Sequence, residues 1–119
     1  MGCRNALVIA ALSLGCIPTP PGQGPKAERG YARTEPVIAA LAEYKRSMGR
    51  VPDSLAQLVP TFLPDSALAT PKRSQEQYPL EYHRIDSTAY TLQFRYVGPG
   101  TNWCAYDSRV GKWKCGGLY

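Results

Sequence analysis

The chain has 119 residues, of which 44% are hydrophobic and 19% are charged, and this length and composition suit one globular domain and exclude several. The net charge is +5 at pH 7, but the basic residues are scattered along the chain rather than gathered in one tract. This distribution argues against a nucleic-acid-binding protein.

The first predicted element is an export signal. An apolar run over residues 6–17 follows the single basic residue Arg4 and ends at Pro18. This run is too short for a membrane-spanning helix, which needs about 20 apolar residues. A short charged segment, an apolar run and a small residue are typical of a secretory signal. We therefore expect residues 1–15 to be a cleaved signal peptide.

The end of this segment, residues 12–16 (LSLGC), resembles the lipobox of bacterial lipoproteins. The resemblance implies a diacylglyceryl group on the thiol of Cys16, cleavage before it, and a membrane-anchored protein facing the periplasm. The family prefers Leu three residues before the cysteine, where this chain has Ser13. Ile17 stands where an Asp retains enteric lipoproteins at the inner membrane, so the outer membrane is favoured. The alternatives are ordinary secretion and an uncleaved or cytosolic chain.

Residues 16–33 are predicted to be a tether, because Pro and Gly are frequent there and large apolar residues are few. A lipid-held domain needs such a linker. The globular domain is then placed at residues 34–119.

Residues 34–48 are predicted to form one long helix. Thr34 can cap its N-terminus, Pro36 suits its first turn, and Gly49 suits the position just after its end. Apolar residues at three- and four-residue spacing make one face, which is expected to be core. These residues are Val37, Ile38, Leu41, Tyr44 and Met48.

A second, short helix is predicted to end by Val59, because Pro60 cannot continue it. Asp53 or Ser54 can cap this helix, and Ser54 and Gln57 have the spacing of a capping box. Its apolar side chains are expected to pack against the first helix. The residues concerned are Leu55, Leu58 and Phe62. An irregular polar loop is predicted over residues 64–79.

From Leu80 onward, apolar residues recur at every second position, which predicts antiparallel strands. The predicted pieces are strands at 80–85 and 90–96, a loop at 98–102, and a hairpin of 103–107 with 112–115. The expected fold is therefore α+β, with an N-terminal helix and a short second helix packed on an antiparallel meander of about four strands.

One register of the terminal hairpin follows if Cys104 faces Cys115. It leaves residues 108–111 as a four-residue loop that ends in Gly, a common hairpin length. The other opposed pairs are then Tyr106 with Trp113 and Asp107 with Lys112. One register thus satisfies a disulfide, an aromatic pair, an ion pair and a turn together. We therefore predict a Cys104–Cys115 disulfide, which needs an oxidising compartment, and no metal site, since the chain has one His.

Residues 41–64 (LAEYKRSMGRVPDSLAQLVPTFLP) resemble a segment common in the globular heads of type IV pilin-like proteins, especially the major pseudopilin of type II secretion. The resemblance covers residues 34–64 specifically and the later strands only by their order. It implies a pilin-head-like fold. The matching residues are Tyr44, Lys45, Gly49, Arg50, Pro52, Ser54, Leu55, Leu58, Val59, Pro60 and Leu63.

The chain departs from filament-forming pilins before this segment. Those proteins keep a long apolar N-terminal helix that begins with Phe and has Glu at its fifth position. In this chain Cys16 is followed by prolines, so the protein is not expected to polymerise as a pilin does. The calcium site of some pseudopilins is not expected either, because no matching acidic cluster lies near the C-terminus.

The sequence contains no constellation typical of an enzyme. His83 is the only histidine, and Glu81 and Asp86 have opposite strand parity, so they do not suggest a carboxylate pair. The Gly-Pro-Gly at 98–100 lacks the Lys and the following helix of a phosphate-binding loop. We therefore expect no enzyme and no cofactor.

The favoured hypothesis is a non-enzymatic, lipid-anchored cell-envelope protein that binds a protein partner. Exposed aromatic residues and arginines anchor interfaces, and the candidates on the outward hairpin face are Trp103, Arg109, Lys112 and Lys114. Alternatively, residues 64–79 cover Trp103 and the cations are only solvated. Two other functions stay open: an accessory component of a type II secretion or type IV pilus system, and a small secreted enzyme inhibitor that uses loop 108–111.

Overall fold

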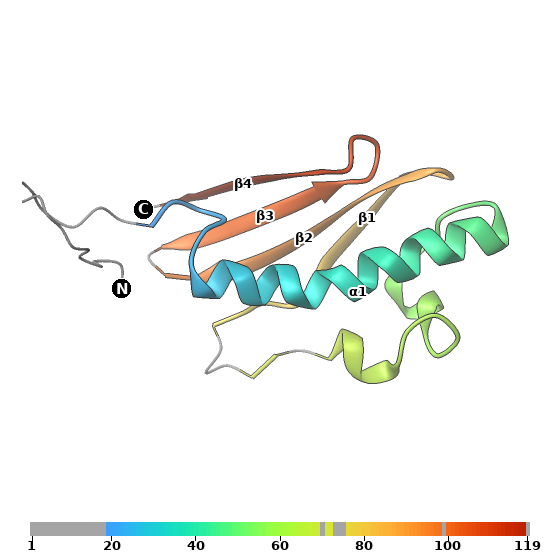
Figure 1. Ribbon diagram of the computed structural model, residues 1–119, viewed down its shortest axis with the longest axis horizontal. Coiled ribbons are helices and arrows are strands. Elements are labelled where there is room, and N and C mark those ends of the chain that lie inside the picture. The colour runs from blue at the N-terminus through green and yellow to red at the C-terminus, as the bar shows by residue number, and fades with distance from the viewer. Residues whose placement is uncertain (1–18, 70, 73–75, 99, 119) are drawn as a thin grey trace, which may run out of the picture.

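The computed structural model describes residues 19–69, 71–72, 76–98 and 100–118. Its elements are the helix α1 (Pro25–Met48), the 3₁₀ helices η2 (Leu55–Leu58) and η3 (Asp65–Leu68), and the strands β1 (Glu81–Asp86), β2 (Ala89–Val97), β3 (Thr101–Asp107) and β4 (Lys112–Leu118). The strands form one antiparallel sheet in the order β1-β2-β3-β4. Figure 1 shows α1 lying along one face of this sheet. The predicted α+β fold is therefore confirmed.

The predicted signal peptide, residues 1–15, and the predicted lipidation site, Cys16, lie outside the described residues. Within the part of the chain that the structure describes, no helix is both long and apolar enough to cross a bilayer.

The helix α1 begins at Pro25, so the predicted start at Thr34 was wrong, and residues 25–33 are helix rather than tether. Thr34 is buried inside the helix, where its hydroxyl donates to the carbonyl oxygens of Gly30 at 3.2 Å and Tyr31 at 3.0 Å. Pro36 also lies inside the helix. The predicted end is confirmed, because Gly49 adopts the left-handed conformation and donates its N–H to the Lys45 carbonyl.

The first part of α1 was missed because its buried face is made of small residues. Ala27 and Gly30 are buried there, and neither contributes to an apolar periodicity. Gly30 lies against the ring of Phe94 on β2, and a Cβ at this position would overlap that ring. The absence of a side chain is therefore what lets the helix approach the sheet so closely.

Two hydrophobic clusters fill the space between α1 and the sheet. The first includes Val37, Leu41, Tyr44, Val51, Leu58, Leu63, Tyr90 and Leu92. The second comprises Ala27, Phe94, Tyr96 and Cys104, with Tyr31, Leu80, Trp113 and Cys115 packed against it. The predicted helix face is thus core, except that Met48 is 58% exposed at the end of α1.

The predicted short helix is η2, which is a 3₁₀ turn with Ser54 as its N-cap residue. The side chain of Gln57 accepts from the Ser54 N–H at 3.3 Å, as the capping-box spacing suggested. Leu58 is buried, and Leu55 and Phe62 pack against the same core. The described part of the following loop contains two features that were not predicted, η3 and a bridge between Gln77 and Tyr96.

The hairpin register is confirmed residue by residue. Cys104 opposes Cys115, and the two form a disulfide with a Cα–Cα distance of 4.1 Å. The other predicted pairs also face each other: Tyr106 with Trp113 and Asp107 with Lys112. Residues 101–102, which were predicted to be loop, belong to β3.

Candidate functional site

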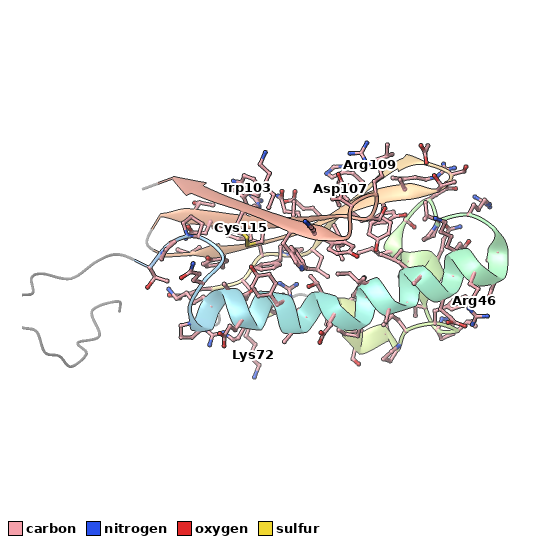
Figure 2. The ribbon with its side chains drawn as sticks, turned by 45° about the horizontal axis from the view of Figure 1, so that its top comes forward. Arg46, Lys72, Trp103, Asp107, Arg109 and Cys115 are labelled. Carbon is pink, nitrogen blue, oxygen red and sulfur yellow. A yellow bond between two sulfur atoms is a disulfide. The ribbon has the colours of Figure 1, made fainter. Side chains whose placement is uncertain are left out.

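The sheet face that points away from α1, called the open face, carries the predicted binding residues of the hairpin. Side chains alternate between the two faces of a strand, and the buried residues Leu92, Phe94 and Cys104 point toward α1. Their neighbours point outward and form rows across the strands. The rows are Arg95–Trp103–Gly116, Gln93–Ala105–Lys114 and Thr91–Asp107–Lys112. Figure 2 shows Trp103 on the side of the sheet away from α1.

Trp103 is half-buried on this face. It lies opposite Gly116, and a Cβ built on Gly116 would be 2.7 Å from the indole Cζ2. The indole therefore lies over the glycine of the edge strand β4. Tyr78, from the segment before β1, lies beside Arg95: the guanidinium carbon of Arg95 is 5.0 Å from the centroid of the Tyr78 ring.

Arg95 lies between the two aromatic residues of this site, Tyr78 and Trp103. Its backbone carbonyl accepts the Tyr78 N–H at 3.0 Å, and its Nε lies 3.0 Å from Glu81 Oε2. Because Arg95 is also the cross-strand neighbour of Trp103, one continuous row runs from Tyr78 through Arg95 to Trp103. Sequence reasoning selected Trp103 but missed the other two. The alternation in β2 placed Arg95 on the correct face, whereas nothing in the loop sequence indicated Tyr78.

Lys112 and Lys114 are exposed on β4, at the edge of the open face. Neither takes part in any of the ion pairs found among the described residues, whereas Arg95 and Arg109 on the same side are paired with Glu81 and Asp107. The two lysines therefore add positive charge to the open face, and Lys114 lies in the row next to Trp103.

The predicted ion pair between Asp107 and Lys112 was wrong, although the two residues face each other. The Asp107 carboxylate instead accepts two bonds from the Arg109 guanidinium, at 3.0 Å from Nε and 2.8 Å from Nη2, and one from the Arg109 N–H at 2.9 Å. A planar guanidinium two residues away satisfies both carboxylate oxygens, which a lysine ammonium cannot do. These hydrogen bonds lower the pKa of Asp107 to about 2.

The loop 108–111 is fixed to the body of the sheet. The Ser108 N–H donates to the Tyr90 carbonyl at 3.1 Å, and the Tyr90 N–H donates to Ser108 Oγ at 2.9 Å. Gly111 has a φ of +67° and donates its N–H to the Asp107 carbonyl at 2.8 Å. Arg109 is thus exposed at the tip, but its guanidinium is held on Asp107 and does not join the two lysines.

The disulfide lies on the opposite, inner face, beneath a segment that sequence reasoning assigned to the tether. We call residues 20–24 the strap. The Gly22 N–H donates to the Tyr96 hydroxyl at 2.9 Å, and the Tyr31 hydroxyl donates to the Gly22 carbonyl at 3.0 Å. The same Tyr31 oxygen lies 3.4 Å from the sulfur of Cys115. Burial raises the pKa of Tyr31.

The titratable residues of β1 serve separate local contacts. Glu81 is paired with Arg95, and Asp86 accepts the N–H and the hydroxyl of Thr88, both at 2.8 Å. These bonds lower the pKa of Asp86. His83 is exposed on the same strand. The geometry therefore does not bring these three residues together as a catalytic group.

Comparison with known proteins finds no matching family model, no matching curated protein and no matching solved structure. What the chain does is therefore inferred from its own residues.

Proposed function

We propose that the protein is a non-enzymatic, lipid-anchored protein of the cell envelope, with a pilin-head-like domain whose open face binds an acidic surface of a protein partner. One observation carries this proposal: Lys112 and Lys114, on the edge strand of the sheet face that α1 leaves uncovered, take part in none of the ion pairs found among the described residues, and Lys114 lies in the row next to Trp103.

The composition of the open face suits a protein interface. Tryptophan and arginine are the residues that most often dominate binding energy, and Trp103 and Arg95 are neighbours on rigid strands. Because Glu81 and Asp107 are already paired with arginines, the remaining charge of the face is positive. A partner with carboxylates at this place gains complementary charge, which favours fast and selective association.

The anchoring part of the proposal depends on residues 12–16, which resemble a lipobox with Cys16 as the acylated residue. The Cys104–Cys115 bridge suits the same location, since disulfides persist in oxidising compartments such as the periplasm. We place the protein in the envelope, facing the periplasm, with the outer membrane favoured by Ile17, and we do not expect it to polymerise as a pilin does.

A second candidate function is an accessory component of a type II secretion or type IV pilus system. The order of a long helix, a turn at Gly49 and a short helix at η2 supports it, because that order is what the resemblance of residues 34–64 implied. Under this function, the partner of the open face is a component of that machinery.

Site-specific photo-crosslinking in a Gram-negative host tests the binding surface. A photoreactive residue at Ala105, directly opposite Lys114 on the open face, should give a crosslinked protein adduct. The matched position Ala42, exposed on α1, should not. Charge reversal by Lys112→Glu with Lys114→Glu should remove the Ala105 adduct, and Lys112→Arg with Lys114→Arg should keep it. An adduct that survives charge reversal, or one equally strong from Ala42, would contradict the proposal.

The intact mass of membrane-extracted protein tests the anchor. We expect residues 16–119 plus acyl chains for the native sequence and no acylated product for Cys16→Ala. An unmodified product from the native sequence would exclude lipidation.

A further inference from the structure

The strap determines where the folded domain begins. Gly22 is held by two hydrogen bonds, to Tyr96 and from Tyr31. It has a φ of +86°, and a Cβ at this position would lie 2.6 Å from the sulfur of Cys115. Lys26, in the first turn of α1, donates to the Val97 carbonyl at 2.9 Å. The chain is therefore fixed to the sheet from Gly22 onward.

This attachment leaves only a short chain between the proposed lipid and the domain. Cys16 and Gly22 are separated by 22 − 16 = 6 residues, and a fully extended chain of this length spans at most about 22 Å. A free tether up to residue 33 would have been 33 − 16 = 17 residues long and would have reached about 60 Å. Because of the strap, the greatest distance between the lipid and the folded domain is about a third of what a free tether up to residue 33 would allow.

The strap also selects one end of the molecule. Figure 1 shows the start of α1, the connection between β2 and β3, and the end of β4 at the same end, while the loop between β3 and β4 and the end of α1 lie at the other. The 24 residues of α1 span about 36 Å, which exceeds the reach of the short tether. Val97, 38% exposed, and the exposed Arg29 lie near the strap end.

We propose that the strap end of the domain is seated at the lipid headgroups and that α1 points away from the membrane. This inference rests on the proposed lipidation of Cys16. The open face then stands upright on the membrane, with Gly116 near the lipid and Lys112 farther out along β4. The hairpin loop 108–111 is at the membrane-distal end, so a partner approaches the open face from the side.

Nuclear magnetic resonance of the acylated full chain in lipid nanodiscs tests this orientation, with a gadolinium chelate on a fraction of the lipid headgroups. We expect the amide signals of Gly22, Gly98 and Gly100 to be broadened most, and those of Gly49, Ser87 and Gly111 least. The control is a chain with a flexible spacer of about 20 residues inserted after Ile17, which adds about 25 Å of mean reach and should weaken this gradient.

The outcomes separate the orientation from the anchor. An acylated mass with broadening that is equal at both ends, or strongest along Ala105 and Lys114 because the open face lies on the lipid, overturns the upright orientation and leaves lipidation standing. A mass without acyl chains removes the proposed anchor, and the orientation falls with it. A gradient that the spacer leaves unchanged also overturns the inference, because the short tether would then not be its cause.

Discussion

The β3–β4 hairpin and the start of α1 meet at the same disulfide but are held by different kinds of contact. In the hairpin the bridged cysteines are 11 residues apart. All the opposed pairs lie on two strands that a single turn connects. At the start of α1 the partners are far apart in the sequence. Gly22 is 74 residues from Tyr96, and Tyr31 is 84 residues from Cys115.

This difference shows how much the stability of each region depends on the rest of the fold. A short hairpin can select its own register, because its turn, its side-chain alternation and its bridge all act locally. Most helical stability in proteins comes from packing, and the start of α1 contains Gly30 against Phe94. We therefore expect the hairpin to resist changes elsewhere and the strap to respond to changes in either region.

The largest effect is expected from removing the bridge that the two regions share. Replacing Cys104 and Cys115 together by Ala should lower the free energy of unfolding by about 3 kcal/mol, on the chain-entropy account of a loop of this length. Urea unfolding measures the loss. Amide hydrogen exchange should show that Gly22 loses protection as well as β4, since the strap lies on the sulfur of Cys115. Unchanged exchange at Gly22 would show that the strap does not depend on the disulfide.

The next effect concerns the start of α1 alone. Alanine is a better helix former than glycine by about 1 kcal/mol, yet Gly30→Ala should lower the free energy of unfolding by about 1–3 kcal/mol, because the new Cβ overlaps the Phe94 ring. The matched control is Arg29→Ala at the exposed neighbouring position, which should change it by less than about 0.5 kcal/mol. A stabilising Gly30→Ala would mean that the helix and sheet are not in close contact.

The fold was predictable wherever a periodic pattern decided it. The alternation in residues 90–96 identified β2 and its buried face, and the hairpin pairs followed from one assumed bridge. The start of α1 was not predictable in this way, because its buried side chains are small and its first nine residues resemble a linker in composition. Its buried residue Ala27 packs with Phe94 and Tyr96, which come about 70 residues later in the chain.

The open face was predictable in part for the same reason. Register alone put Trp103, Lys112 and Lys114 on one face. Tyr78 was missed because its position over Arg95 depends on how a loop without periodicity returns to the sheet. The partner of Asp107 was misassigned because register specifies which residues are opposite, whereas the reach and shape of Arg109 determine which one binds the carboxylate.

A smaller effect is expected from the hydroxyl that joins the strap to α1. Tyr31→Phe removes the hydrogen bond to the Gly22 carbonyl but keeps the ring beside Phe94 and Trp113. We expect a loss of about 1 kcal/mol in the free energy of unfolding and faster amide exchange at Gly22. Tyr78→Phe on the open face is the matched control and should leave exchange at Gly22 unchanged. Equal exchange in both variants would show that the strap does not depend on this hydroxyl.

The smallest effect tests the one hairpin contact that register assigned wrongly. The pKa of Asp107 is lowered to about 2 by the Arg109 hydrogen bonds, below the usual value near 4. A lowered carboxyl pKa stabilises the folded state above the unfolded pKa, and this contribution is lost as the pH falls from about 4 to about 2. Arg109→Ala should remove that part of the acid destabilisation, measured by urea unfolding between pH 6 and pH 2. Lys112→Ala should preserve it.

The comparison between these two variants tests mainly Asp107. Asp86 also has a lowered pKa, but the Arg109 charge is the smallest of its causes, and its Thr88 bonds remain in both variants. A profile that flattens in Lys112→Ala but not in Arg109→Ala would mean that the carboxylate bonds across the strands, as register alone suggested. The result also bears on the open face: if Lys112 were engaged by Asp107, only Lys114 would remain to attract an acidic partner, and reversing Lys112 alone should not affect the Ala105 crosslink.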